Sequence, residues 1–130
     1  MPVTYEIDRA RNLVRTACVG FVTFQEVMAH FNTLENDPRR AGVMDVLLDL
    51  RGLTSTPETG QLRRAAKRIE PEQTPLQWGV CALVATDPAA ISTGKLFAVF
   101  ARDRFRATTV VSSLEEADRW IELQSRPQAG

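Results

Sequence analysis

The sequence predicts one α/β domain, a mostly parallel mixed sheet of about five strands with an antiparallel edge hairpin and four helices. Two apolar segments separated by a short polar turn open the chain. Short apolar runs then alternate with segments of helical periodicity, which is typical of parallel strands joined by right-handed crossovers. The chain has 130 residues, 44% of them hydrophobic and 25% charged, which is the size and composition of a single globular domain.

The first three elements follow from local patterns near the N-terminus. The apolar segments 3–7 and 13–19 flank a polar stretch, which predicts a β-hairpin. Thr23 and Glu26 are spaced as a capping box, so a helix is expected to begin there. Apolar residues recur at helical spacing up to Leu34, and the helix is expected to end just after it.

The middle of the chain predicts a strand, a helix and another strand. Residues 44–50 are short, apolar and bounded by glycines, as in a buried central strand. Thr56 is expected to cap the second helix with Pro57 in its first position, where the missing N–H is no loss. Residues 79–85 read as the next buried strand. The inner face of the helix is formed by Leu62, Ala65, Ala66 and Ile69.

The last three elements are marked by their caps. Asp87 followed by Pro88 is typical of a helix start, and a third helix is predicted from there. Residues 108–111 are β-branched and form the last predicted strand. Ser113 and Glu116 make a second capping box, which begins the final helix.

Domain limits and location follow from what the sequence lacks. The domain is predicted to span residues 1–124, and residues 125–130 to form a flexible tail. No secretory signal and no apolar run of about 20 residues is present, so a soluble, cytoplasmic protein without membrane insertion is expected. Sixteen basic and sixteen acidic residues cancel, which argues against nucleic acid as a partner.

The sequence offers few groups for catalysis or metal binding. Cys18 and Cys81 lie in separate strand-like segments and are expected to be buried free thiols. His30 is the sole histidine, and it is expected to be a partly exposed surface residue. With no spacing typical of metal ligands, we expect no catalytic residues, no metal and no cofactor, and thus no enzyme.

Three segments carry a family resemblance: NLVR at 12–15, VTFQE at 22–26 and VLLDLRGLT at 46–54. Together with the element order over residues 3–124, they resemble the STAS domain family, and more closely its SpoIIAA-like branch of small stand-alone bacterial domains. The resemblance implies a non-catalytic regulatory module, similar to anti-sigma-factor antagonists, that binds another protein.

The same resemblance draws attention to the start of the second helix. Family members carry Asp-Ser-Ser-Gly or Asp-Ser-Thr-Gly there, and a partner kinase phosphorylates the third residue. The corresponding residues here are Pro57, Glu58, Thr59 and Gly60, so only the last two match. We interpret Glu58, Thr59 and Gly60 as the equivalent of this phosphosite or as a partner-binding loop. Glu58 is a hypothetical fixed negative charge in place of phosphate, and the alternative is an ordinary first turn.

Two further sets of residues suggest different partners. A basic helix face is expected to contact a partner protein or to be merely solvated, and it comprises Arg63, Arg64, Lys67 and Arg68. Aromatic residues suggest instead a SEC14-like pocket for a small apolar ligand or lipid, and they are Trp78, Phe97, Phe100, Phe105 and Trp120. Aromatics at such positions also commonly fill a core. A homodimer is a further expectation.

Overall fold

In a computed structural model of the protein, residues 2–125 are described, and they form five strands and four helices. Their order is β-β-α-β-α-β-α-β-α, as the sequence predicts. The strands are β1 (Val3–Asp8), β2 (Leu13–Gly20), β3 (Val43–Leu53), β4 (Gln77–Val84) and β5 (Ala107–Val111). The helices are α1 (Phe24–Glu35), α2 (Thr59–Arg68), α3 (Pro88–Phe100) and α4 (Leu114–Ser125).

The strands form one mixed sheet in the order β1-β2-β3-β4-β5. β1 pairs antiparallel with β2 as the predicted edge hairpin, and the other neighbours pair in parallel. Each parallel step is made by a helical crossover, which is how consecutive strands can pair in parallel. Every step moves across the sheet in the same direction, so the strands lie in the order of the chain. The α/β class, the edge hairpin and the parallel remainder are therefore confirmed.

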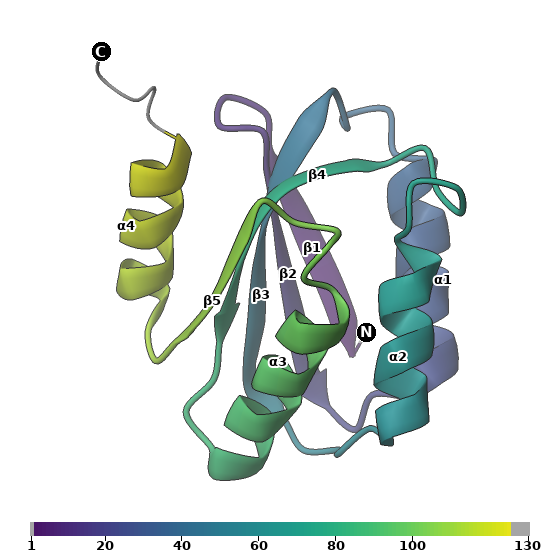
Figure 1. Cartoon of the computed structure of the whole chain (residues 1–130), viewed down its shortest axis with the longest axis vertical. Helices are drawn as coiled ribbons and strands as arrows, with labels where there is room; N and C mark the ends of the chain where they lie inside the picture. The colour runs from purple at the N-terminus through teal and green to yellow at the C-terminus, as the bar shows by residue number, and fades with distance from the viewer. Residues whose placement is uncertain (1, 126–130) are drawn as a thin grey trace.

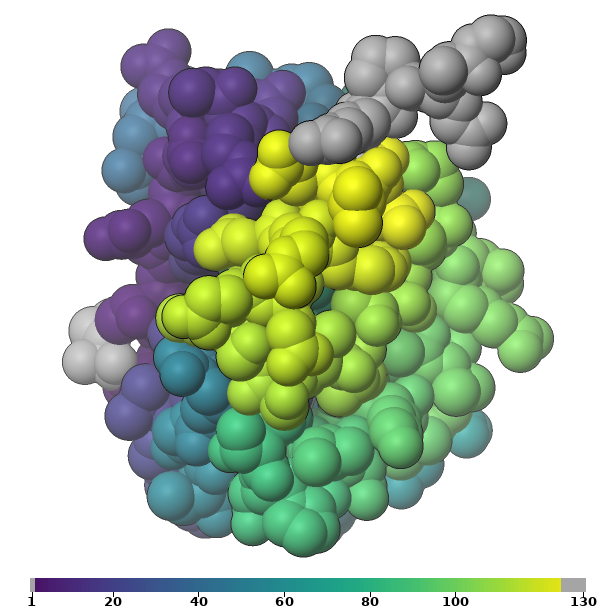
Figure 2. All heavy atoms as spheres, turned by 90° about the vertical axis from the view of Figure 1, so that its left-hand side faces the viewer, coloured from purple at the N-terminus to yellow at the C-terminus, as the bar shows by residue number. Residues whose placement is uncertain are grey.

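The helices lie on both faces of the sheet (Figure 1). Side chains of α1, α2 and α3 pack together against one face, with Phe31, Ala66 and Phe97 in a common apolar cluster. α4 alone covers the opposite face, where Ala117 and Ile121 pack on Val80 and Ala82. Figure 2 shows the surface of this second face, with α4 lying across it.

Local capping accounts for where most helices begin. In α1 the Thr23 hydroxyl accepts from the Glu26 N–H at 3.2 Å, and the Glu26 carboxylate accepts from the Thr23 N–H at 2.9 Å, as predicted. Asp87 caps α3, with Pro88 in the first turn. Ahead of α4, only half of the predicted box forms. The Ser113 hydroxyl accepts from the Glu116 N–H, whereas the Glu116 carboxylate accepts from Ser112.

The prediction for the start of α2 was wrong. The helix begins at Thr59 with Glu58 as its N-cap, and Thr56 and Pro57 remain in the preceding loop. The side-chain oxygen of Gln61 accepts a hydrogen bond from the Glu58 N–H at 3.0 Å, which satisfies a backbone donor at this later position. Pro57 contributes instead to the wall of an apolar cavity. Tertiary packing thus overrides the local cap-and-proline signal.

The C-terminal limit differs slightly from expectation. Ser125, predicted to begin a flexible tail, is the last residue of α4. The rest of the predicted tail, residues 126–130, lies outside the described residues. Within the described part of the chain, no helix is both long and apolar enough to cross a bilayer.

Candidate functional site

An apolar cavity lies between the sheet and helices α1, α2 and α3. Its volume is about 160 Å³, close to that of engineered cavities that bind a benzene molecule. The cavity reaches from β1, at the sheet edge, to β4, and its wall is completed by the loops that precede α1 and α2. It is the candidate site, because concave and mostly apolar spaces are where small molecules bind.

The strands supply the floor of the cavity. Alternate side chains of a strand point to the same face, so Val14, Thr16 and Cys18 of β2 all line it. On β3 the same alternation brings Val46, Leu48 and Leu50 to the cavity. β4 contributes Trp78, Cys81 and Leu83.

The helices supply the roof, and two small side chains leave it incomplete. Phe31 of α1, Leu62 of α2 and Phe97 of α3 are large residues in the wall. Ala65 of α2 and Thr93 of α3 also face the cavity, where larger apolar side chains would fill space. Protein interiors are normally packed with few voids, so these positions help to keep the cavity open.

One polar pair lies in this wall. The Thr16 hydroxyl oxygen is 3.4 Å from Nε2 of His30, which comes from α1. The His30 ring also packs edge-on against Tyr5 of β1, with 5.3 Å between ring centroids. Burial lowers the pKa of His30 to about 4, because the apolar surroundings disfavour the charged imidazolium. At neutral pH the cavity therefore contains a neutral imidazole.

His30, which the sequence predicts to be a partly exposed surface residue, also faces the cavity. The side chain is half-buried and lines the cavity together with Val27, Phe31 and Leu34 of the same helix. His30 lies three residues after Val27 and four before Leu34, and such spacing places residues on one helix face. This periodicity was the signal that His30 faces inward.

Trp78 has an unusual indole group. Its Nε1 is the one buried side-chain nitrogen in the described part of the chain for which no hydrogen-bond partner is found. The ring lies beside Phe105, with 6.0 Å between centroids, and both residues line the cavity. Buried indole N–H groups usually find an acceptor.

The five aromatic residues proposed from the sequence as pocket-lining fall into three groups. Trp78, Phe97 and Phe105 line the cavity. Phe100 lies instead under the guanidinium of Arg63 at the surface, 4.8 Å away. Trp120 packs with α4 on the opposite face of the sheet. The prediction was wrong for the last two residues. Trp120 fills the core on the α4 face, because helical periodicity alone does not show which face of a sheet a helix covers. Phe100 is on the same face as the cavity, but it is the last residue of α3 and lies outside the cavity wall.

Glu58, Thr59 and Gly60, the candidate phosphosite or partner-binding loop, form the start of α2. Glu58 is the N-cap, and Thr59 and Gly60 are the first two helical residues. Both Thr59 and Gly60 are exposed. Helix amino termini favour negative charge, and Glu58 places a carboxylate at this end.

Three of the four basic residues of α2 contact side chains of the neighbouring helices. The Arg63 guanidinium stacks on Phe100, and that of Arg64 lies 4.9 Å from the ring centroid of Phe24 in α1. Lys67 is exposed. Only Lys67 therefore resembles the simple solvated cation that a basic helix face suggests.

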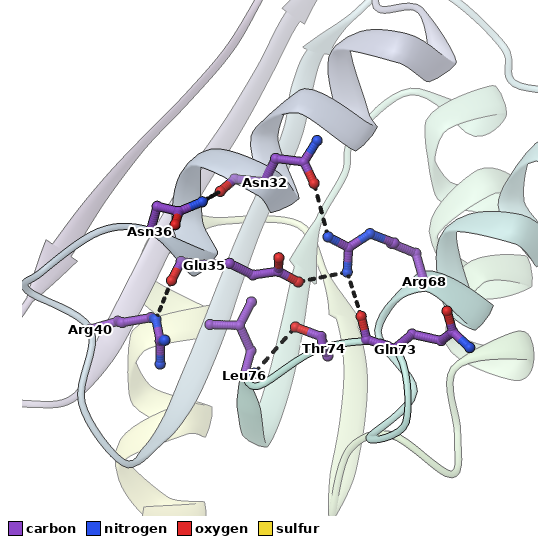
Figure 3. A network of polar contacts seen from close by, with 8 residues as sticks. All are labelled: Asn32, Glu35, Asn36, Arg40, Arg68, Gln73, Thr74 and Leu76. Carbon is purple, nitrogen blue, oxygen red and sulfur yellow. Dashed lines mark hydrogen bonds and ion pairs between the residues drawn. The ribbon is translucent and has the colours of Figure 1, made fainter.

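Arg68 is the centre of a polar network that joins α2 to α1 (Figure 3). Its guanidinium lies 2.6 Å from the Glu35 carboxylate, donates to Asn32 Oδ1 at 3.0 Å and donates to the Gln73 carbonyl at 3.2 Å. Arg68 and Glu35 are both largely buried, with side-chain exposures of 20% and 17%. Arg68 holds the pKa of Glu35 below its usual value by hydrogen bonding. Its position makes it a structural residue that fastens the roof of the cavity.

The remaining chemistry is sparse, and comparison with known proteins adds no assignment. Burial raises the pKa of Cys18 to about 11 and that of Cys81 to about 12, so neither thiol is ionised at neutral pH. In residues 2–125, no cluster of three or more side chains is arranged to hold a metal ion. Comparisons of the chain with models of protein families, with curated proteins and with solved structures found no match.

Proposed function

We propose that this protein is a non-catalytic domain that binds a small apolar molecule in the cavity between the sheet and α1, α2 and α3. The observation that carries the proposal is the cavity itself, about 160 Å³ in volume and walled almost entirely by aliphatic and aromatic side chains. Its size fits a compact ligand better than the long chain of a lipid.

The energetic cost of an empty cavity supports this function. When core side chains are shortened, each Å³ of cavity that remains costs about 24 cal/mol, so unpacked apolar space is unfavourable. A ligand bound in this space would supply the packing contacts that the protein side chains do not make. Departures from ideal packing also concentrate at functional sites.

The test is a titration with benzene in which binding is monitored by the melting temperature and by the fluorescence of Trp78. Trp120→Phe makes Trp78 the sole tryptophan, and Trp78 lines the cavity. We expect saturable binding and a rise in melting temperature that grows with benzene concentration, since a ligand stabilises the state that it binds. A melting temperature and a fluorescence that do not respond to benzene would contradict the proposal.

A cavity-filling variant gives the test its control. Ala65→Leu places a larger side chain in the cavity from α2, so it should abolish benzene binding and keep or raise the melting temperature. Ala29→Leu makes the same chemical change at an exposed position of α1 and should bind benzene as the unmodified chain does. Loss of binding in both variants would show that the effect is not specific to the cavity.

A second candidate, a protein-interaction module, is favoured by an exposed apolar patch. Val19 and Phe21, at the end of β2, are 58% and 71% exposed. Backbone bonds tie this segment to the loop before α2, because Thr54 donates to the Gly20 carbonyl at 3.0 Å. Neighbouring apolar side chains that are exposed can mark an interaction site, and aromatic residues are enriched at protein interfaces. The resemblance to SpoIIAA-like domains points to the same end of the molecule.

The two candidates are separated by surface variants. For the interaction module, Phe21→Ser and Thr59→Ala should each release a cellular partner that the unmodified chain captures, whereas Arg119→Ser on the exposed part of α4 should retain it. Because Glu58 already supplies a fixed negative charge, Thr59 is expected to remain unphosphorylated in native protein analysed by mass spectrometry. If Phe21→Ser and Thr59→Ala both retained the captured partner, this surface would be ruled out.

A further inference from the structure

The wall of the cavity contains polar groups that indicate which apolar molecules suit it. Thr16 Oγ1 and His30 Nε2 are 3.4 Å apart, beyond the usual distance of about 2.7–3.2 Å for a good hydrogen bond. Both side chains line the cavity, from opposite sides, because Thr16 comes from the sheet and His30 from α1. This weak contact leaves both groups able to bond to a third partner that lies beside them.

Several other polar side chains in the wall are already engaged. The Ser55 hydroxyl both donates to and accepts from the backbone of Val22. The Thr23 hydroxyl caps α1, and the Gln61 oxygen accepts from the Glu58 N–H. Apart from Trp78 Nε1, for which no partner is found, Thr16 and His30 therefore have the weakest hydrogen bond among these polar groups of the wall. A ligand that bonds to them displaces only this weak contact.

Charge is excluded from the cavity. None of the described residues that line it is Asp, Glu, Lys or Arg. Burying a charged group without an opposite charge is costly, whereas burying a hydroxyl that finds hydrogen bonds costs little. A carboxylate or an ammonium group is thus a poor occupant, and a neutral polar group is an acceptable one.

We infer that the cavity takes a neutral molecule of about the size of one aromatic ring that carries a single hydroxyl group, which bonds to Thr16 and His30. The inference rests on the proposed function and names the ligand class for that same site. A hydroxyl group suits the pair because it donates and accepts at once. It can therefore bond to a hydroxyl on one side and to either tautomer of a neutral imidazole on the other.

The experiment compares toluene, phenol and benzoate, which have similar size and shape but differ in polarity and charge. Binding is measured near neutral pH by the fluorescence of Trp78 in the Trp120→Phe chain and by calorimetry. We expect phenol to bind at least as tightly as toluene, since its hydroxyl is satisfied in the cavity. Benzoate should show no saturable binding, because its charge has no partner there.

A matched pair of variants tests the role of Thr16. Thr16→Val keeps the shape and removes the hydroxyl, so it should weaken phenol binding about tenfold by leaving one hydrogen bond unmade. Thr109→Val is the control. Thr109 lies two residues from both Ala107 and Val111 on β5, so it shares their face of the sheet, which packs against α4 and not against the cavity. Thr109→Val should bind phenol as the unmodified chain does.

The outcomes separate this inference from the proposed function. If neither toluene nor phenol binds, both the proposed function and the inference are overturned. If toluene binds but phenol binds much more weakly, or benzoate binds as well as phenol, the proposed function stands and the inference is overturned. Should Thr16→Val fail to fold, the ranking of the three probes on the chain with native Thr16 still decides the question.

Discussion

The Asp45 carboxylate on β3 accepts a hydrogen bond of 2.9 Å from the backbone N–H of Val80 on β4. The register between these two strands shifts at this point, between Met44 and Val46. The carboxylate thus replaces a backbone partner where the ladder is irregular. It reaches into the space beside Gly79, where no side chain is present.

Gly79→Ala is expected to destabilise the fold by about 1–3 kcal/mol, because the new Cβ would overlap the Asp45 carboxylate. Denaturant unfolding measures the change. Gly60→Ala is the matched control, since its Cβ would meet only the Arg64 side chain, at 4.0 Å, in the first turn of α2. We expect this control to be neutral or stabilising, as alanine favours helix. An equal loss of stability in both variants would contradict the explanation.

Arg68→Met should lower the free energy of unfolding by about 2 kcal/mol, because it leaves the largely buried Glu35 carboxylate without its cation and breaks the link between α1 and α2. Lys67→Met, at the exposed neighbouring position, should change the free energy by less than about 0.5 kcal/mol. Chemical denaturation of both variants checks the prediction. Equal effects would place Arg68 among ordinary surface cations.

The stability of the protein should depend on pH through His30. Burial lowers the pKa of His30 from 6.5 to about 4, so the unfolded chain binds a proton more readily than the folded one. The stabilisation that comes from keeping His30 neutral is complete above about pH 6.5. It is lost as the pH falls toward 4, which lowers the free energy of unfolding by up to about 3 kcal/mol.

Two measurements check this pH dependence. Because His30 is the sole histidine, NMR titration of one imidazole gives its pKa in the folded protein directly. His30→Gln should remove the change in unfolding free energy between about pH 6.5 and 5, above the range where most carboxylates titrate. A folded-state pKa of His30 near 6.5 would contradict its burial against the cavity.

Cys18 and Cys81 should be nearly inert toward iodoacetamide at mildly alkaline pH in the folded protein. Both are buried, and desolvation raises their pKa values to about 11 and about 12, so the reactive thiolate is scarce. Both should react rapidly in denaturant. Gln25→Cys, at an exposed position of α1, provides a reactive control. Mass spectrometry that found Cys81 labelled as fast as the new Cys would contradict the packing described.

Local patterns in the sequence determined most of the secondary structure. The apolar runs 44–50 and 79–85 became β3 and β4, and the capping box of Thr23 and Glu26 set the start of α1. These signals work because a helix cap and the apolar pattern of a buried strand are both set by residues within a few positions of one another. The same holds for the edge hairpin, whose two strands are joined by a short turn.

Only the tertiary structure decided where α2 begins, which face of the sheet α4 covers and what the arginines contact. Pro57 is drawn into the cavity wall and Arg68 bonds to α1, and such contacts join residues far apart in the sequence. The cavity depends on the same long-range packing. Its floor comes from strands and its roof from three helices, and a void is defined by what those side chains fail to fill. The sequence therefore determined the elements and their order, whereas the space between the layers was decided by how they pack.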